Sequence, residues 1–131
     1  MTQEYKELLI KDLCARLPYN VICQVEFKED GKYNSKVMLL SGIFTDEAYF
    51  TTKGGSIYSN EYKPYLRPMS SMTEEEQRTL DSMCNGVEMV SRLSGLKMFD
   101  KAFNWLNENH FDYRGLIEKG LALDATGLKI Y

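Results

Sequence analysis

The chain opens with apolar side chains at helical spacing. Within residues 3–17, leucines recur at every fourth position, at Leu9, Leu13 and Leu17, while charged residues stand on the other side. This pattern is typical of an amphipathic helix with one buried face. Pro18 predicts the end of this helix, because proline lacks a backbone donor and restricts the residue before it.

Helical spacing then gives way to alternation. Every second residue from Val21 to Phe27 is apolar or a cysteine, which indicates a strand with one buried face. Four short strands are predicted in all, over residues 21–28, 36–44, 48–52 and 56–59. Short strands in such close succession favour a meander. We therefore expect a small antiparallel sheet or a partly open barrel, with the first helix covering one face or one end.

Residues 60–71 interrupt the alternation with two prolines, Pro64 and Pro68, and two tyrosines, Tyr62 and Tyr65. Proline fits neither a helix interior nor a central strand. The segment is therefore predicted to be an extended linker whose tyrosines pack against the sheet.

Two helices are predicted after this linker. Thr73 and Glu76 have the spacing of a capping box, in which each side chain bonds the backbone amide of the other, so a helix should begin here and run to about residue 84 or 85. A second helix is expected over residues 96–109. Its apolar stripe would be formed by Phe99, Ala102, Phe103 and Leu106.

The segments around these helices are predicted to be short or irregular. Residues 87–95 should form a short helix or a turn, residues 111–120 a loop, and residues 121–125 a short strand or turn. The expected fold class is α+β, with an N-terminal helix plus a small antiparallel sheet or partly open barrel, followed by a helical C-terminal half. Residues 1–68 would form the helix and sheet lobe with its linker, and residues 69–131 the helical lobe with its C-terminal loop, together as one compact unit.

Composition and charge limit the possible classes of protein but do not identify a function. A chain of 131 residues suffices for one core. Its net charge of -3 disfavours non-specific attraction to nucleic acid or anionic lipid, but leaves a local basic patch open. The first 17 residues offer no apolar stretch for a signal peptide or membrane span. We expect a cytoplasmic protein with no membrane partner.

No residue set predicts catalysis or metal binding. The three cysteines, Cys14, Cys23 and Cys84, are too widely spaced for a disulfide framework or a paired metal motif. His110 is the only histidine. It could act as a general base oriented by Asp112 or Glu108, but a histidine complementing a helix C-terminus is the favoured interpretation. We therefore expect no enzymatic activity, no cofactor and no metal site.

Two loop segments are the candidate partner-binding regions. They combine aromatic, basic and proline residues, a mixture enriched at binding hot spots. The candidate residues are Tyr62, Lys63, Tyr65 and Arg67 in the first segment, and His110, Phe111, Asp112, Tyr113 and Arg114 in the second. The leading hypothesis is a non-enzymatic protein-interaction module. Half-buried tyrosines in the first segment and core aromatics in the second are the structural interpretations that stay open.

The alternative function is binding of a single-stranded nucleic acid. Tyr62 and Tyr65 would stack on bases while Lys63 and Arg67 contact phosphates. Binding of this kind should depend steeply on salt concentration.

Three stretches of the chain resemble a family of short uncharacterised proteins encoded by bacteriophages and mobile elements of gut bacteria. They are residues 13–19 (LCARLPY), 63–73 (KPYLRPMSSMT) and 105–117 (WLNENHFDYRGLI). Asn20 stands where the family's turn is expected to have glycine, and both residues suit a left-handed backbone. The resemblance implies a phage or prophage accessory protein that acts inside a bacterial host cell. It implies no activity and no catalytic residue.

Overall fold

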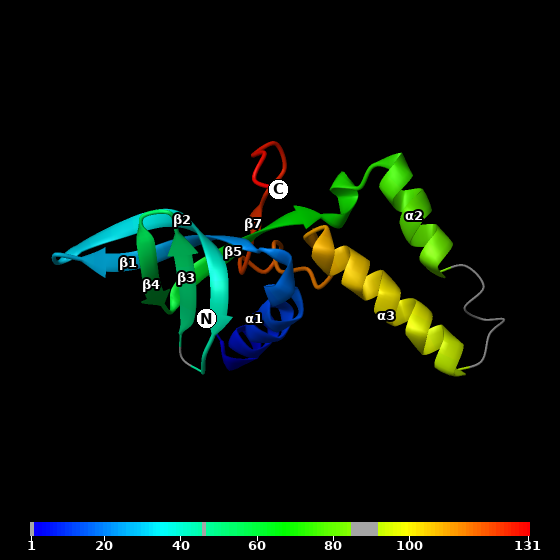
Figure 1. The fold of residues 1–131 in the computed structure, drawn as a ribbon, viewed down its shortest axis with the longest axis horizontal. Helices are drawn as coiled ribbons and strands as arrows, with labels where there is room; N and C mark the ends of the chain where they lie inside the picture. Colours follow the sequence, from blue (N-terminus) through cyan, green and yellow to red (C-terminus); the bar gives the residue numbers. More distant parts are fainter. Residues whose placement is uncertain (1, 46, 85–91) are drawn as a thin grey trace.

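The computed structural model describes residues 2–45, 47–84 and 92–131. It shows an α+β fold built on one open, mixed sheet of seven strands, in the order β4-β3-β2-β1-β5-β6, with β7 also paired to β5 (Figure 1). The helices are α1 (Gln3–Arg16), α2 (Glu74–Cys84) and α3 (Arg92–Glu108), with short 3-10 turns η1 (Leu17–Tyr19) and η2 (Met69–Ser71). The strands are β1 (Ile22–Glu29), β2 (Lys32–Ile43), β3 (Ala48–Thr52), β4 (Gly55–Ser59), β5 (Glu61–Pro68), β6 (Phe111–Asp112) and β7 (Leu123–Asp124).

The predicted first helix is confirmed as α1. The side chain of Thr2 accepts a hydrogen bond from the Tyr5 amide at 3.2 Å and caps its first turn. Leu9 and Leu13 are buried in the same cluster as the inward side chains of the sheet. Pro18 lies in the 3-10 turn that follows the helix, as expected from its missing amide.

The four predicted strands are confirmed as β1 to β4, which form an antiparallel meander. The structure extends β2 four residues before its predicted start, because its tip pairs with the end of β1. Inward residues of neighbouring strands, including Val25, Leu40 and Phe50, are buried together. The side chain of Ser59 donates a 2.6 Å bond to the Glu26 carbonyl, which ties the end of β4 to β1.

The predicted linker over residues 60–71 is wrong: most of it is strand β5, inside the sheet. Its first half, Glu61 to Pro64, pairs with β1, and its second half pairs in parallel with β7 and β6. Pro64 is the last β5 residue that pairs with β1, and Pro68 is the last residue of the strand. The missing amides therefore fall where a ladder ends, so both prolines are tolerated.

The capping box is confirmed at the start of α2. The Thr73 amide donates to the Glu76 carboxylate at 3.0 Å, and the Glu76 amide donates to the Thr73 hydroxyl at 3.1 Å. α3 begins at Arg92, four residues before the predicted start. The prediction for residues 87–95 falls mostly on residues 85–91, outside the described part of the chain.

The predicted helical C-terminal half is not confirmed as such, because two short strands also lie there. β6 falls within the predicted loop, while β7 falls within the predicted short strand over residues 121–125. Both pair with β5, and α2 and α3 extend as a pair away from the sheet (Figure 1). Among the helices of the described residues, none has both the length and the apolar character needed to span a bilayer.

Replacing Thr73 with alanine should lower the free energy of unfolding by about 1 kcal/mol, because the α2 cap loses its side-chain acceptor. Urea denaturation followed by circular dichroism measures this. Thr79, whose hydroxyl bonds only the Glu75 carbonyl one turn earlier, supplies the control. Equal losses for Thr73→Ala and Thr79→Ala would contradict the capping role.

Candidate functional site

The two predicted loop segments meet at Arg67. Its backbone amide donates to the His110 carbonyl at 2.8 Å, where β5 pairs with β6. The guanidinium carbon lies 4.1 Å from the centroid of the Phe111 ring. Arg67 and Phe111 lie 44 positions apart in sequence, in the two separate predicted segments. In the structure they form one junction at the edge of the sheet.

Glu76 holds Arg67 from the α2 side. Two guanidinium nitrogens donate to the two carboxylate oxygens of Glu76 at 2.8 and 2.7 Å. These bonds are the main cause that lowers the pKa of Glu76 to about 2. The same carboxylate closes the capping box, so Arg67 links the sheet to the start of α2.

The first predicted segment is divided between two faces of the sheet. The Tyr62 ring packs against Phe50 on the covered face, with ring centroids 5.1 Å apart. Because side chains alternate along a strand, Lys63, Tyr65 and Arg67 lie on the opposite face. The hydroxyl of Tyr65 donates to a Gln24 side chain at 2.9 Å. These four residues do not form the single surface that the nucleic-acid hypothesis requires.

The second predicted segment is mostly buried. Phe111 is fully buried and Asp112 is almost fully buried. The Asp112 carboxylate accepts hydrogen bonds from the backbone amides of Leu116 and Ile117 at 2.8 and 2.9 Å. Only Tyr113 and Arg114 are partly exposed, besides a small part of His110. The hypothesis of an exposed binding loop therefore rests on Tyr113 and Arg114 alone.

A buried ionic network behind this segment was missed by the sequence analysis. Arg16 is fully buried and donates twice to Asp12, at 2.7 and 3.1 Å, and once to the Phe111 carbonyl, at 2.6 Å. Arg114 donates to the same Asp12 carboxylate at 2.8 Å. The i,i+4 spacing of Asp12 and Arg16 was a visible signal. Nothing in the sequence indicated that residues about a hundred positions away complete it.

His110 is stacked on Tyr131, with ring centroids 3.5 Å apart and planes at 10°. It is 8% exposed, its φ is +62°, and its Nδ1 is buried with no hydrogen-bond partner among the described residues. Burial, followed by the charges of Arg16 and Arg67, lowers its pKa to about 4. Asp112 is occupied with backbone amides, so it does not orient the imidazole as a general base would require.

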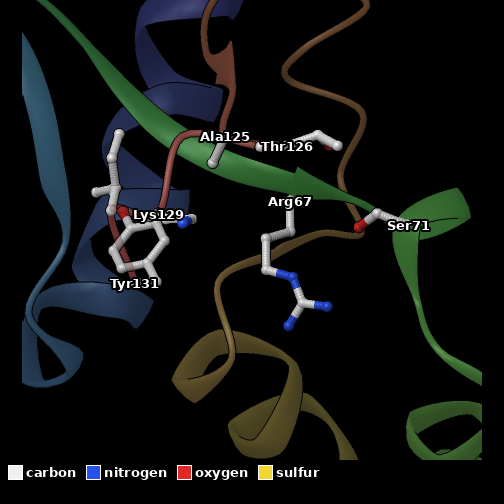
Figure 2. A pocket seen from close by; sticks show the side chains of 8 residues that line it. Arg67, Ser71, Ala125, Thr126, Lys129 and Tyr131 are labelled. Carbon is white, nitrogen blue, oxygen red and sulfur yellow. The ribbon is translucent and has the colours of Figure 1, made fainter.

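A cleft of about 250 Å³ lies beside this junction (Figure 2). It is formed by the end of β5, the following turn and the C-terminal segment. Its lining residues are Arg67, Ser71, Ala125, Thr126, Gly127, Lys129, Ile130 and Tyr131.

A larger hollow of about 540 Å³ lies at the other end of the sheet, and its charged lining residues are three glutamates and Lys28. Glu26, Glu47 and Glu61 are among its lining residues, and Glu26 stands directly opposite Glu61 on neighbouring strands. Like charges in such positions repel each other and any phosphate group. Across the described residues, no three histidine, cysteine, aspartate or glutamate side chains are grouped closely enough to hold a metal ion.

The predicted apolar stripe of α3 is only half buried. Ala102 and Leu106 are buried as expected, but Phe99 and Phe103 are 42% and 47% exposed. Leu96, on the same side of the helix, is 66% exposed. The Phe103 ring also packs on Tyr113, with ring centroids 5.3 Å apart, so the set is partly covered. A partly exposed apolar set of this kind is unusual on a helix that already packs on neighbours.

Comparison with known proteins gives no relative: no family model, no curated protein and no solved structure matches this chain.

Replacing Asp12 with asparagine should destabilise the fold by about 3–5 kcal/mol, because Arg16 keeps its charge in the interior without a carboxylate. The double variant Asp12→Leu with Arg16→Met should recover a large part of this loss, since no buried charge remains. Urea denaturation of the wild type and of both variants measures the loss and its recovery. A loss below about 1 kcal/mol for Asp12→Asn would contradict the network's role.

His110 should stay neutral down to about pH 4 in the folded protein. The unfolded chain takes up this proton near pH 6.5, so the free energy of unfolding should fall as pH drops through this window. NMR titration of the single imidazole measures the pKa, and denaturation at several pH values measures the slope. The control variant His110→Asn keeps a residue suited to positive φ and should flatten the slope. An imidazole titrating at its ordinary value would contradict this assignment.

Proposed function

We propose that this protein is a non-enzymatic protein-interaction module that binds one amphipathic helix of a protein partner on the exposed side of α3. The observation that carries the proposal is the exposed apolar seam of Leu96, Phe99 and Phe103. The resemblance to phage-encoded proteins supports an accessory role inside a bacterial host cell.

The spacing of the seam favours a helix as the occupant. Positions i, i+3 and i+7 are those of the contact seam in a two-helix coiled coil. At 100° per residue, the three side chains fall within about 60° of the α3 circumference. They adjoin the buried Leu106, so the apolar arc continues beyond the part that the protein covers.

The surroundings of the seam also fit an added helix. α2 packs against α3, and helices gain most by burying apolar stripes against other helices. Lys97, Asp100 and Lys101 are exposed beside the seam and give it a polar margin. Apolar anchors within a polar margin are the usual anatomy of a protein interface.

Leu96→Glu and Phe103→Glu together should reduce partner recovery from bacterial lysate at least about tenfold, because buried anchors carry more than 1.4 kcal/mol each. The matched control is Lys97→Glu with Lys101→Glu, which changes charge on the polar side and should recover the partner as the wild type does. Affinity purification with quantitative mass spectrometry measures recovery, and circular dichroism checks the fold.

A photo-cross-linking residue at position 99 tests the occupant itself. It should cross-link a helical segment with apolar residues at positions i, i+3 and i+7, whereas the same residue at position 101 should not. Cross-linking to a second copy of this chain, to an extended segment, or equally from both positions would contradict the proposal. Fluorescence anisotropy with mixed single-stranded oligonucleotides at low salt tests the alternative, and tight salt-dependent binding would favour it instead.

A further inference from the structure

The sheet is open between β4 and the outer part of β1, which leaves two strand edges beside each other. β4 is the terminal strand of the sheet and, among the described residues, pairs with β3 alone. β1 pairs with β2 along its whole length, but with β5 only from Cys23 to Glu26. The outer part of β1, residues 27–29, therefore has a free edge on the side that β4 approaches (Figure 1).

Ser59 joins these two edges at one end. Its hydroxyl donates to the Glu26 carbonyl at 2.6 Å, so the last residue of β4 is tied to β1 where the pairing with β5 stops. β4 runs antiparallel to β1, because each of the three intervening pairs is antiparallel. Beyond Ser59 the two edges flank the hollow of about 540 Å³, which we call the edge groove and which is lined by residues 27–28 of β1 and 57–59 of β4.

Backbone hydrogen-bond groups on both edges face the edge groove without a strand partner. In an antiparallel pair, every second residue directs its amide and carbonyl away from the other strand. Counted from the two-residue turns that close both hairpins, these residues are Lys28 on β1, and Ser56 and Tyr58 on β4. The Glu26 carbonyl accepts the Ser59 hydroxyl on the same side, as this alternation requires. An extended segment placed in the groove would pair with these groups.

The inner wall of the edge groove is apolar. Because side chains alternate along a strand, Phe27 and Ile57 lie on the covered face of the sheet, and Ile57 packs against the core. Both side chains are only partly buried. Every second side chain of an added strand would point to this wall, so apolar residues are favoured there.

The outer wall of the edge groove is acidic. Glu26, Glu47 and Glu61 line it, and none of them forms an ion pair with another described residue. Lys28 is the one basic residue among the described lining residues, so the charged side chains sum to two negative charges. Tyr58 is 56% exposed and adds an aromatic ring, a surface that suits the stem and the charge of lysine or arginine.

We infer that the edge groove binds an extended segment of a protein partner that alternates basic and apolar residues and adds a strand to the free edge of β4. The edge from Gly55 to Tyr58 is about 13 Å long at roughly 3.3 Å per residue, which gives room for about four residues of the partner. Backbone pairing would supply affinity, and the acidic and apolar walls would select the sequence. This surface is separate from the α3 seam and does not depend on the proposed helix partner.

The test is an NMR titration of the full chain with a short capped peptide of alternating lysine and valine. We expect saturable binding with a Kd on the order of 0.1–1 mM. Exchange of the Lys28, Ser56 and Tyr58 amides with solvent should slow about tenfold at saturation, because these amides become hydrogen-bonded. The same peptide with an N-methylated backbone keeps its charge but has no amide donors, and it should not bind.

Glu26→Gln with Glu61→Gln should weaken binding of the lysine–valine peptide about three- to tenfold at low salt, because two carboxylates of the outer wall are removed. The double variant also relieves the repulsion between these cross-strand neighbours, so the fold should stay intact. The matched control is Glu74→Gln with Glu75→Gln, which changes the net charge equally at exposed positions of α2 and should bind as the wild type does.

Four results would overturn the inference. They are the absence of saturable binding, equal binding of the N-methylated peptide, equal weakening by both double variants, and equal binding of a peptide of alternating glutamate and valine. Slower exchange of the Ser56 and Tyr58 amides on raising the protein concentration without peptide would instead identify a second copy of this chain as the occupant, and would also overturn it. Circular dichroism of each variant checks the fold.

Discussion

A buried carboxylate determines how the two ends of the chain meet. Asp12 has no access to water, so it requires cations, and it receives them from Arg16 one turn along α1 and from Arg114 in the C-terminal segment. Arg16 in turn donates to the Phe111 carbonyl, which lies in β6. The ionic network therefore fixes β6 beside β5, and the position of β6 places Phe111 under Arg67.

Arg67 connects this network to the start of α2. Its backbone belongs to β5, its plane rests on Phe111, and its donors reach the Glu76 carboxylate that caps α2. One side chain thus connects the sheet, the C-terminal segment and the start of α2.

The parts of the fold that could be predicted from sequence are those set by local chemistry. The alternation from Val21, the leucine spacing of α1 and the Thr73–Glu76 capping box each depend on neighbours within about ten positions. β5 was mistaken for a linker because its tolerance of proline depends on where its ladders end, which is a tertiary property. Two-residue strands such as β6 and β7 carry no periodicity at all, so only their pairing with β5 defines them.

The same contrast between local sequence signals and tertiary contacts explains which parts of the candidate site could be predicted. Composition pointed to residues 62–67 and 110–114, and the two segments do meet at Arg67, yet most of their aromatic rings are used internally. An exposed apolar surface is found instead on α3, where the sequence showed a stripe but not which half of it the protein would cover. A helix stripe is buried only as far as its neighbours reach, and here Ala102 and Leu106 are buried while Phe99 and Phe103 stay 42% and 47% exposed. Apolar area left in water costs about 25 cal/mol per Å², and we propose that a partner helix covers this half of the stripe.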